Sequence, residues 1–510
     1  MVKKATIIAL TVVALSLGSC VGGGPGAKAW EKEYDVAIIG AGMGGLSCGA
    51  YLAKAGMKVL ICEQHSVPGG YCTSFERDGF TFETTIHSLQ ECGEGGLIYQ
   101  TLEDLGIQDE IKFIPLDPVR RVVGKDYGLT LSSDIKQLED DLVAMFPAEK
   151  EAIRELIVDA ITFDIENPEL MMSLVGKTNG DIIEPRFQDP KLKLILYSIG
   201  GPPQTQAIWG LIPQFNTLSR KNNYFPEGGG RALANLFART FKEYGGDLAL
   251  NTLVTKILIE GGKAVGLELE SGEKIKAKYV VSNADARLTF LKLVGEEWLP
   301  EEFTQKLLEA EVWPSAFLVS LGVDMDLGSL GFGGEVIHYS PAESIEELTT
   351  TDPRKMGIDI IIQSLRDPSL APPGKHAVSI MALLPYHYMD NWHTEDGKRG
   401  EEYRKLKEQV ADRLIASAEN VIPGLLEHIV YQDVATPLTY ERYTLNYQGS
   451  IMGWLSTPEN IAWIYGWGQR TPIENLYQAG HWAGIGGIPT VIFSGKTAAD
   501  LILKDIQEAK

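Results

Sequence analysis

The folded part of the chain begins with short apolar runs on either side of an amphipathic stretch. Residues 36–39 are apolar and rich in branched side chains, Leu46 and Ala50 recur at helical spacing, and residues 58–62 form a second, mostly apolar run. Short runs of branched residues are typical of buried strands, whereas a spacing of three or four is typical of a helix that packs on one face. Residues 34–63 are therefore predicted to form a strand, a helix and a second strand.

The turn between the first predicted strand and the helix contains Gly40, Gly42, Gly44 and Gly45, and Glu63 ends the second strand. Gly40 permits a tight turn, Gly42 lets a pyrophosphate approach the backbone, and Gly45 lets helix and strand pack closely. The helix N-terminus offers free N–H groups to phosphates, and Glu63 can accept hydrogen bonds from both ribose hydroxyls. Because strand, turn, helix, strand and acid occur in this order, the stretch is predicted to bind a dinucleotide.

A second glycine turn follows the acidic residue. Gly69, Gly70 and Tyr71 come shortly after Glu63, and the aromatic residues 79–83 predict another short strand. This order resembles the FAD-binding half of flavin oxidoreductases and amine oxidases. The resemblance favours FAD over NAD as the dinucleotide.

Later stretches resemble one family of FAD enzymes. In residues 224–285 an amphipathic helix is followed by four short predicted strands, and the other stretches are residues 435–444, 449–454 and 475–489. Together they resemble the family of phytoene desaturases, carotene isomerases and retinol saturases. The resemblance spans nearly the whole chain from residue 34 to residue 503.

Further cofactor contacts follow from the resemblance and from the last predicted helix. The resemblance implies that the backbone of Val254 contacts the adenine. Gly480, Gly487 and Ile488 precede or open that helix. Free N–H groups at this point suit the inner phosphate, the ribityl chain and the flavin C2 carbonyl.

The predicted fold class is α/β, with a Rossmann-like FAD-binding domain of the glutathione-reductase or amine-oxidase type and an inserted α+β substrate domain. The FAD domain is expected to be discontinuous and to comprise residues 34–115, 221–290 and 470–510. The substrate domain is expected to comprise residues 116–220 and 291–469. Within it we expect helices at 134–145, 149–162 and 401–421, and one sheet that contains residues 315–323, 359–364 and 377–384.

No second dinucleotide-binding glycine motif follows a predicted strand. Residues 331–334 are glycine-rich, but they lead into the strand-like residues 335–337 rather than into a helix. A permanent NAD(P) domain is therefore not expected. Electrons are expected to enter or leave the flavin through a quinone, oxygen, a partner, or transiently bound NAD(P)H.

Two apolar segments and one aromatic cluster each have two interpretations. Residues 192–199 and 205–215 carry little charge, and the cluster comprises Trp454, Trp463, Tyr465 and Trp467. Such residues either form buried core or line a tunnel or membrane-facing mouth for an apolar substrate. The pattern alone leaves both interpretations open.

Composition and charge limit the partners. The 510 residues are 44% hydrophobic, which is ample for buried cores, and the formal net charge is −22. This acidic balance argues against nucleic acid and against electrostatic attraction to anionic lipid. Cys48, Cys62, Cys72 and Cys92 have no CxxC spacing and no histidine cluster beside them. No metal site is therefore expected.

The first residues resemble the signal of a bacterial lipoprotein. A basic start precedes the apolar residues 5–17, which are too short to cross a bilayer as a helix, and the sequence LGSC ending at Cys20 resembles a lipoprotein box. Residues 1–20 are predicted to be the signal, with Cys20 lipidated, and residues 21–33 a flexible tether. The expected location is the periplasmic or other extracytoplasmic face of a membrane. The alternative is a cytoplasmic, membrane-peripheral protein with an uncleaved leader.

The chemistry that the resemblance implies is hydride transfer between flavin N5 and a carbon of a long apolar polyene or isoprenoid taken from a membrane. Desaturation, saturation and cis–trans isomerisation all fit. His87 and His481 are the candidates for handling the proton, because an imidazole titrates near neutrality. His87 ends a stretch that resembles a family pattern near the flavin, with Glu83 where Asp is usual and Thr85 where Gly is usual. The alternatives are an amine oxidase-like enzyme and a non-enzymatic, flavin-containing lipoprotein that carries a lipid or carotenoid.

Overall fold

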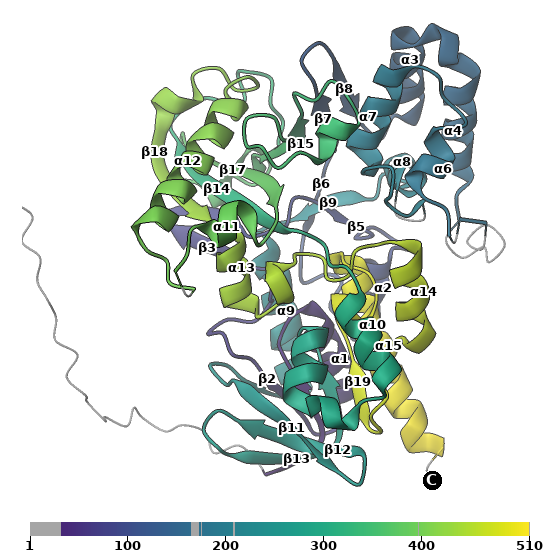
Figure 1. The fold of residues 1–510 in the computed structure, drawn as a ribbon, viewed down its shortest axis with the longest axis vertical. Coiled ribbons are helices and arrows are strands. Elements are labelled where there is room, and N and C mark those ends of the chain that lie inside the picture. Colours follow the sequence, from purple (N-terminus) through teal and green to yellow (C-terminus); the bar gives the residue numbers. More distant parts are fainter. Residues whose placement is uncertain (1–31, 165–172, 175, 208–209, 396, 509–510) are drawn as a thin grey trace, which may run out of the picture.

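The computed structural model describes residues 32–164, 173–174, 176–207, 210–395 and 397–508. The predicted lipoprotein signal, its Cys20 and nearly all of the predicted tether lie outside the described residues. Two large sheets organise the structure, one in the lower part and one in the upper part of Figure 1. Over the described ranges, no helix combines the length and apolar character needed to cross a membrane.

The lower sheet has seven strands in the order β10, β2, β1, β13, β12 and β11, and β19 pairs with β13. The strands β10, β2, β1, β13 and β19 are mutually parallel, so their carboxyl ends lie along one edge of the sheet. Their apolar runs are buried on both faces, as parallel sheets require. The bounds are β1 Glu33–Ile39, β2 Val59–Cys62, β10 Asp247–Ala249, β11 Val254–Glu260, β12 Lys263–Leu269, β13 Lys274–Ser282 and β19 Leu476–Gln478.

Helices pack on the lower sheet through their apolar stripes. The helix α1 contacts α9, α15 and α2, and a Cβ at Gly495 would lie 2.2 Å from the carbonyl oxygen of Gly44, so α1 and α15 touch through glycine. The predicted strand, helix and strand of residues 34–63 are confirmed, as are the helix and four strands expected between 232 and 285. The bounds are α1 Met43–Lys54, α2 Leu97–Leu105, α9 Gly230–Glu243 and α15 Ile488–Glu508.

The upper sheet also has seven strands, in the order β18, β14, β17, β16, β15, β7 and β8. Alternate side chains of β14, such as Phe317 and Val319, pack with the apolar stripe of α12, so Leu318 points to the opposite face. The three strands expected near 315, 359 and 377 lie in this one sheet, and α12 confirms the helix expected from 401. The bounds are β7 Arg120–Val123, β8 Gly128–Leu131, β14 Ser315–Val323, β15 Val336–Tyr339, β16 Ile358–Ile361, β17 His376–Leu384, β18 Ile429–Ala435 and α12 Glu401–Ala418.

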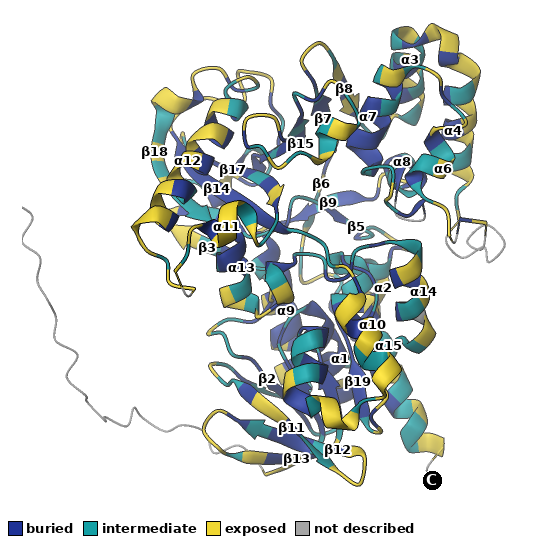
Figure 2. Cartoon of the chain, viewed as in Figure 1, coloured by how far each residue is buried: buried dark blue, intermediate teal, exposed yellow. Residues whose placement is uncertain are grey.

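A helical cluster beside the upper sheet buries the first apolar segment. Leu192, Ile195 and Leu196 pack with Leu142 and Leu156 of neighbouring helices, and Figure 2 shows these helices buried inside and exposed outside. The core interpretation of residues 192–199 therefore holds. The end of the second segment, from Leu211, belongs to α8 and packs in the same core. The bounds are α3 Ile135–Met145, α4 Lys150–Thr162, α6 Asn179–Ile183, α7 Pro190–Gly200 and α8 Leu211–Ser219.

The three tryptophans of the aromatic cluster also pack in a core. Trp454 is 2% exposed, and Trp467 meets Phe290 edge to face with ring centroids 5.8 Å apart. This cluster packs behind the lower sheet, with α10 (Glu301–Glu309) and α14 (Pro458–Trp467), and its tryptophans do not line the cavity between the two sheets.

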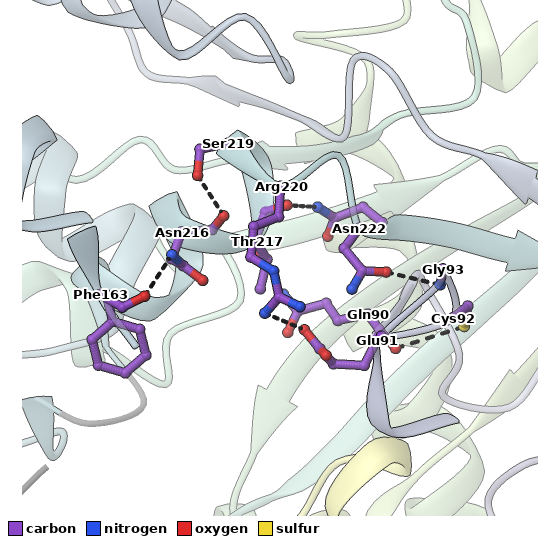
Figure 3. Close-up of polar contacts among 12 residues, drawn as sticks. Gln90, Glu91, Cys92, Gly93, Phe163, Asn216, Thr217, Ser219, Arg220 and Asn222 are labelled. Carbon is purple, nitrogen blue, oxygen red and sulfur yellow. Dashed lines mark hydrogen bonds and ion pairs between the residues drawn. The ribbon is translucent and has the colours of Figure 1, made fainter. Parts of the chain in front are cut away.

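A polar junction joins the two parts of the molecule (Figure 3). It lies beside a small sheet of β5 (Leu89–Gln90), β9 (Asn223–Pro226) and β6 (Phe113–Pro115). The backbone N–H of Gly93 donates to Asn222 Oδ1 at 2.9 Å, and Gln90 Nε2 donates to Thr217 Oγ1 at 3.3 Å. These bonds attach the segment after β5 to the end of α8 and hold Gln90 in the cavity wall.

An aromatic hairpin makes a second connection between the sheets. The strands β3 (Ser74–Arg77) and β4 (Phe80–Glu83) pair with each other, and the Phe82 ring stacks on Tyr431 of β18 with centroids 5.9 Å apart. The short strand predicted at residues 79–83 is therefore confirmed, but its aromatic side chains pack on the upper sheet.

Candidate active site

A cavity of about 950 Å³ has walls from both sheets. Ile39, Gly40 and Cys62 come from the carboxyl edge of the lower sheet, and Leu318 and Met381 come from the open face of the upper sheet. Ligands of open α/β sheets bind outside the carboxyl ends of the strands. The volume lies at the upper end of the range for small-molecule sites, which leaves room for more than a small ligand.

The predicted glycines form a close cradle at this edge. Gly40 has φ +90°, which favours glycine, and a Cβ at Gly45 would lie 2.2 Å from the carbonyl oxygen of Gly40. A Cβ at Gly44 would lie 2.6 Å from the backbone nitrogen of Gly480. The motif therefore brings β1, α1 and the segment after β19 together. Gly42, the residue before α1, has no side-chain cap, so the first N–H groups of α1 keep their capacity for a phosphate.

Glu63 directly follows β2 and lines the cavity. Its Oε2 accepts from the N–H of Ala41 at 2.7 Å, and its Oε1 accepts from the N–H of His65 at 2.8 Å. Burial raises the pKa of Glu63, although these backbone donors act in the opposite direction. Val254 lines the same cavity at the start of β11. Both residues are thus placed where an adenosine half could contact them.

The second glycine turn and the last helix line the same cavity. Gly69 donates its N–H to the carbonyl oxygen of Ala41 at 2.8 Å, which pins the turn that contains Gly70 and Tyr71 against the first glycine loop. Gly480 has φ +86° and Gly487 has φ +111°. Ile488 opens α15, so a second helix N-terminus meets the cavity. Two helix N-termini, two glycine turns and one acid suit the phosphates and ribose of FAD.

Sequence reasoning missed two residues of this cradle. The Asn283 side chain lies within 4 Å of the Cβ positions of all four motif glycines, and its Nδ2 would be 2.7 Å from a Cβ at Gly42. Arg231 lines the cavity, and its buried Nε has no hydrogen-bond partner among the described residues. An unpaired buried guanidinium nitrogen is costly unless an anion meets it. Both lie in segments quoted for the family resemblance, but a motif does not reveal which side chain reaches the glycines.

One transverse row of the upper sheet forms the roof of the cavity. The pairing register aligns Ala435, Leu318 and Met381 across β18, β14 and β17, and all three line the cavity. We call these three residues the apolar roof. The same row continues through Asp359 of β16 to His338 of β15. The row therefore changes from apolar residues that line the cavity to charged residues that lie beside it.

His87 lies beside the charged end of this row. It lines the cavity, its side chain is 18% exposed, and its Nδ1 is 4.0 Å from Asp359 Oδ2. Asp359 Oδ1 is bound by Arg120 at 2.9 Å and by His338 Nδ1 at 2.8 Å. Burial acts to raise the pKa of Asp359, but Arg120 and the histidines outweigh it and hold that pKa well below its usual range. Burial lowers the pKa of His87, while Asp359 opposes this effect.

His481 has a different environment. It also lines the cavity, where its ring packs beside Trp482 with centroids 5.3 Å apart and beside Tyr71 at 6.1 Å. Among the described residues it has no hydrogen-bond or ion-pair partner. Burial alone lowers the pKa of His481 to about 4. The two predicted histidines therefore share one cavity, but only His87 is close to a carboxylate.

A parallel sheet whose glycine turn and helix N-termini face a partly apolar cavity is typical of a dinucleotide-binding enzyme. The chain belongs to the flavin-containing amine oxidoreductase family, whose model matches residues 43–503. The predicted α/β fold, the cofactor FAD and the oxidoreductase class are confirmed. No cluster of His, Cys, Asp and Glu suited to a metal ion occurs in the part of the chain that the structure describes.

Individual relatives agree with the resemblance found in the sequence. The chain is 29% identical to the chloroplastic prolycopene isomerase of Daucus carota, over 93% of this chain and 81% of that protein. It is 26% identical to the lycopene-forming phytoene desaturase of Pseudescherichia vulneris, over 92% and 99%. It is 23% identical to the all-trans-retinol 13,14-reductase of Danio rerio, over 92% and 86%. Among solved structures, an oxidoreductase from Methanosarcina mazei matches with a TM-score of 0.64 and 19% identity, over 91% and 99%.

Proposed function

We propose that this enzyme rearranges, forms or reduces carbon–carbon double bonds in a long apolar polyene or isoprenoid. The observation that carries the proposal is the apolar roof, which lines the same cavity as the FAD cradle. Burying apolar substrate surface against such a wall is favourable by about 25 cal/mol per Å². Relatives named prolycopene isomerase, phytoene desaturase and retinol reductase support this substrate class.

In this reaction the residues of the chain bind and orient the substrate, exclude water and transfer a proton. When FAD is bound, it supplies the hydride chemistry. The apolar roof binds and orients the substrate and excludes water. His87 takes up or returns the proton, because a neutral imidazole beside a carboxylate is ready to accept one. His481 is a weaker candidate, because its imidazolium has no nearby anion to stabilise it.

The amine oxidase alternative has less support from this cavity. A cationic amine needs a carboxylate or an aromatic cage at the point of reaction. The carboxylates in the cavity lining are Glu63, which lies in the dinucleotide cradle, and Asp433 of β18. Neither belongs to the apolar roof. The rings of Tyr71 and Tyr440, with centroids 5.9 Å apart, do line the cavity, so the preference for a polyene rests on the roof and on the named relatives.

A panel of polyenes and unsaturated lipids tests the proposal, with anaerobic enzyme and with the isomer ratio and conjugation length as readouts. A saturase shortens the conjugation when the enzyme is supplied reduced. A desaturase lengthens it when the enzyme is supplied oxidised with a quinone, or with oxygen in a parallel aerobic sample. An isomerase changes the isomer ratio without net redox change. No change with the whole panel, together with rapid turnover of a polar amine and release of peroxide, would overturn the proposal.

A bulky roof variant connects the activity to this cavity. Met381→Trp should reduce polyene turnover about tenfold or more by filling the space beneath β17, while FAD content is unchanged. Leu383→Trp is the matched control, because Leu383 lies two residues further on the same strand and is 42% exposed. Equal losses in both variants would point to a general effect on the sheet.

We also propose that the substrate arrives from a membrane to which the protein is attached by a lipid on Cys20. The support is the lipoprotein-like sequence of residues 1–20, followed by a glycine-rich stretch. Two acyl chains hold a protein on a bilayer because each buried methylene contributes about 0.8 kcal/mol. The electron partner is a quinone, oxygen or transiently bound NAD(P)H. The proposed side of the membrane is extracytoplasmic.

A further inference from the structure

We propose that Asp359 is the positioning residue that makes His87 Nε2 the proton-handling atom of the cavity. The inference rests on the proposed function, in which His87 exchanges a proton with the substrate. The two oxygens of the Asp359 carboxylate have different neighbours. Oδ1 accepts hydrogen bonds from Arg120 and His338, and Oδ2 faces the imidazole of His87.

The distances from Asp359 show how its two carboxylate oxygens differ. Arg120 at 2.9 Å and His338 Nδ1 at 2.8 Å both bind Oδ1 of Asp359. Oδ2 has no such ligand among the described residues, and His87 Nδ1 lies 4.0 Å from it. A movement of about 1 Å would close this contact to a hydrogen bond, and catalytic hydrogen bonds are often long before ligands bind. The arrangement favours the tautomer with hydrogen on Nδ1, which leaves Nε2 as the free nitrogen.

The same chain segment also holds the backbone of His87. Gln363, which follows β16 and is 5% exposed, donates from Nε2 to the carbonyl oxygen of His87. Asp359 and Gln363 therefore orient the imidazole and its backbone from one side. The charged and titratable groups that face His87 are Asp359 on β16 and Arg120 on β7, with His338 on β15 behind the carboxylate.

The proton balance of the step is simple. In the oxidising direction two neighbouring substrate C–H bonds break. The hydrogen of one leaves as a proton and forms an N–H bond at His87 Nε2, and the electron pair of that bond forms the new C=C bond. The hydrogen of the other would leave with its electron pair as a hydride, for which bound FAD would be the acceptor. Nδ1 keeps its hydrogen and Asp359 stays anionic, so the carboxylate stabilises the imidazolium without taking its proton. In the reducing direction the same N–H bond returns the proton.

Histidine NMR tests the inference without any substrate. In wild-type holoprotein labelled with ¹⁵N and ¹³C at its eight histidines, the His87 signals, identified by their loss in His87→Gln, should report hydrogen on Nδ1. Asp359→Asn should lower the pKa of His87 because the anion is removed. The opposite tautomer, or an unchanged pKa, would overturn the inference even if the enzyme acts on polyenes.

Kinetics supply the second readout. Asp359→Asn should move the acid limb of the pH–rate profile to lower pH and reduce the plateau rate about 10- to 100-fold. Asp359→Glu should restore part of the plateau rate and part of the position of the acid limb. Because this variant keeps a negative charge beside Arg120, it also serves as the test if Asp359→Asn folds poorly. Asp324→Asn is the control, because Asp324 makes a similar pair with His428 Nδ1 at 3.0 Å on the surface. Wild-type kinetics in Asp359→Asn with an intact FAD content would also refute the role.

Discussion

Gly42 immediately precedes α1 and Gly45 lies in the first turn of that helix, and alanine at each should cause a different failure. A Cβ at Gly42 would lie 2.7 Å from Asn283 Nδ2, the end of a side chain that can rotate. A Cβ at Gly45 would lie 2.2 Å from the carbonyl oxygen of Gly40, a backbone atom between β1 and α1. Gly42→Ala should therefore fold but bind FAD weakly. Gly45→Ala should instead lower the free energy of unfolding of the protein itself.

The magnitudes follow from these contacts. Gly42→Ala should cost about 1 kcal/mol of folding free energy, the low end for overpacking, since the amide of Asn283 can move. A phosphate held away from the start of α1 loses about two charge-assisted hydrogen bonds, each worth about 1.5–3 kcal/mol. FAD should then bind about 10²- to 10⁴-fold more weakly. Gly45→Ala should cost about 3 kcal/mol or more of folding free energy, because backbone must shift.

Two measurements separate these outcomes. Thermal or urea unfolding of the apoproteins gives the folding cost, and titration with FAD gives the dissociation constant. Gly128→Ala on β8 is the matched control, because a Cβ there meets nothing within 4 Å, and it should leave both quantities unchanged. The reasoning is refuted if Gly42→Ala binds FAD within threefold of wild type, or if Gly45→Ala unfolds like wild type.

Two further predictions concern stability and location. Burial raises the pKa of Glu83 from 4.5 to about 8. Between these two pH values the native state keeps a proton that the unfolded chain has released. The free energy of unfolding therefore falls as the pH rises from about 4.5 to about 8. Glu83→Gln keeps an acceptor for the N–H of Gly230. Relative to wild type, its free energy of unfolding should be higher by on the order of 3 kcal/mol at pH 8 and by much less at pH 5. Equal dependence of the unfolding free energy on pH in wild type and variant, measured by urea unfolding, would contradict this. Cys20→Ala should move the protein out of the membrane fraction or block its processing, whereas a mature protein that still begins at Met1 would count against the lipid anchor.

Local patterns were sufficient for the dinucleotide half of the site. Gly40, Gly42 and Gly45 act through backbone conformation and close approach, which depend on neighbours within a few residues, and Glu63 follows its strand directly. Such short-range relations can be predicted from the order of the residues along the chain. The strand, helix and strand of residues 34–63, the FAD cofactor and the family could therefore be predicted from the amino-acid sequence alone.

Tertiary structure decided which apolar and polar residues line the cavity. Hydrophobic pattern predicts that a residue is buried, but it does not name its partner. Residues 192–199 and the tryptophans looked suitable for a tunnel, yet they pack into cores. The roof comes from Leu318, Met381 and Ala435, which are aligned by hydrogen-bond register between strands far apart in the chain. The pairing of His87 with Asp359 depends on the same register, because only the folded sheet brings β16 beside the segment after β4.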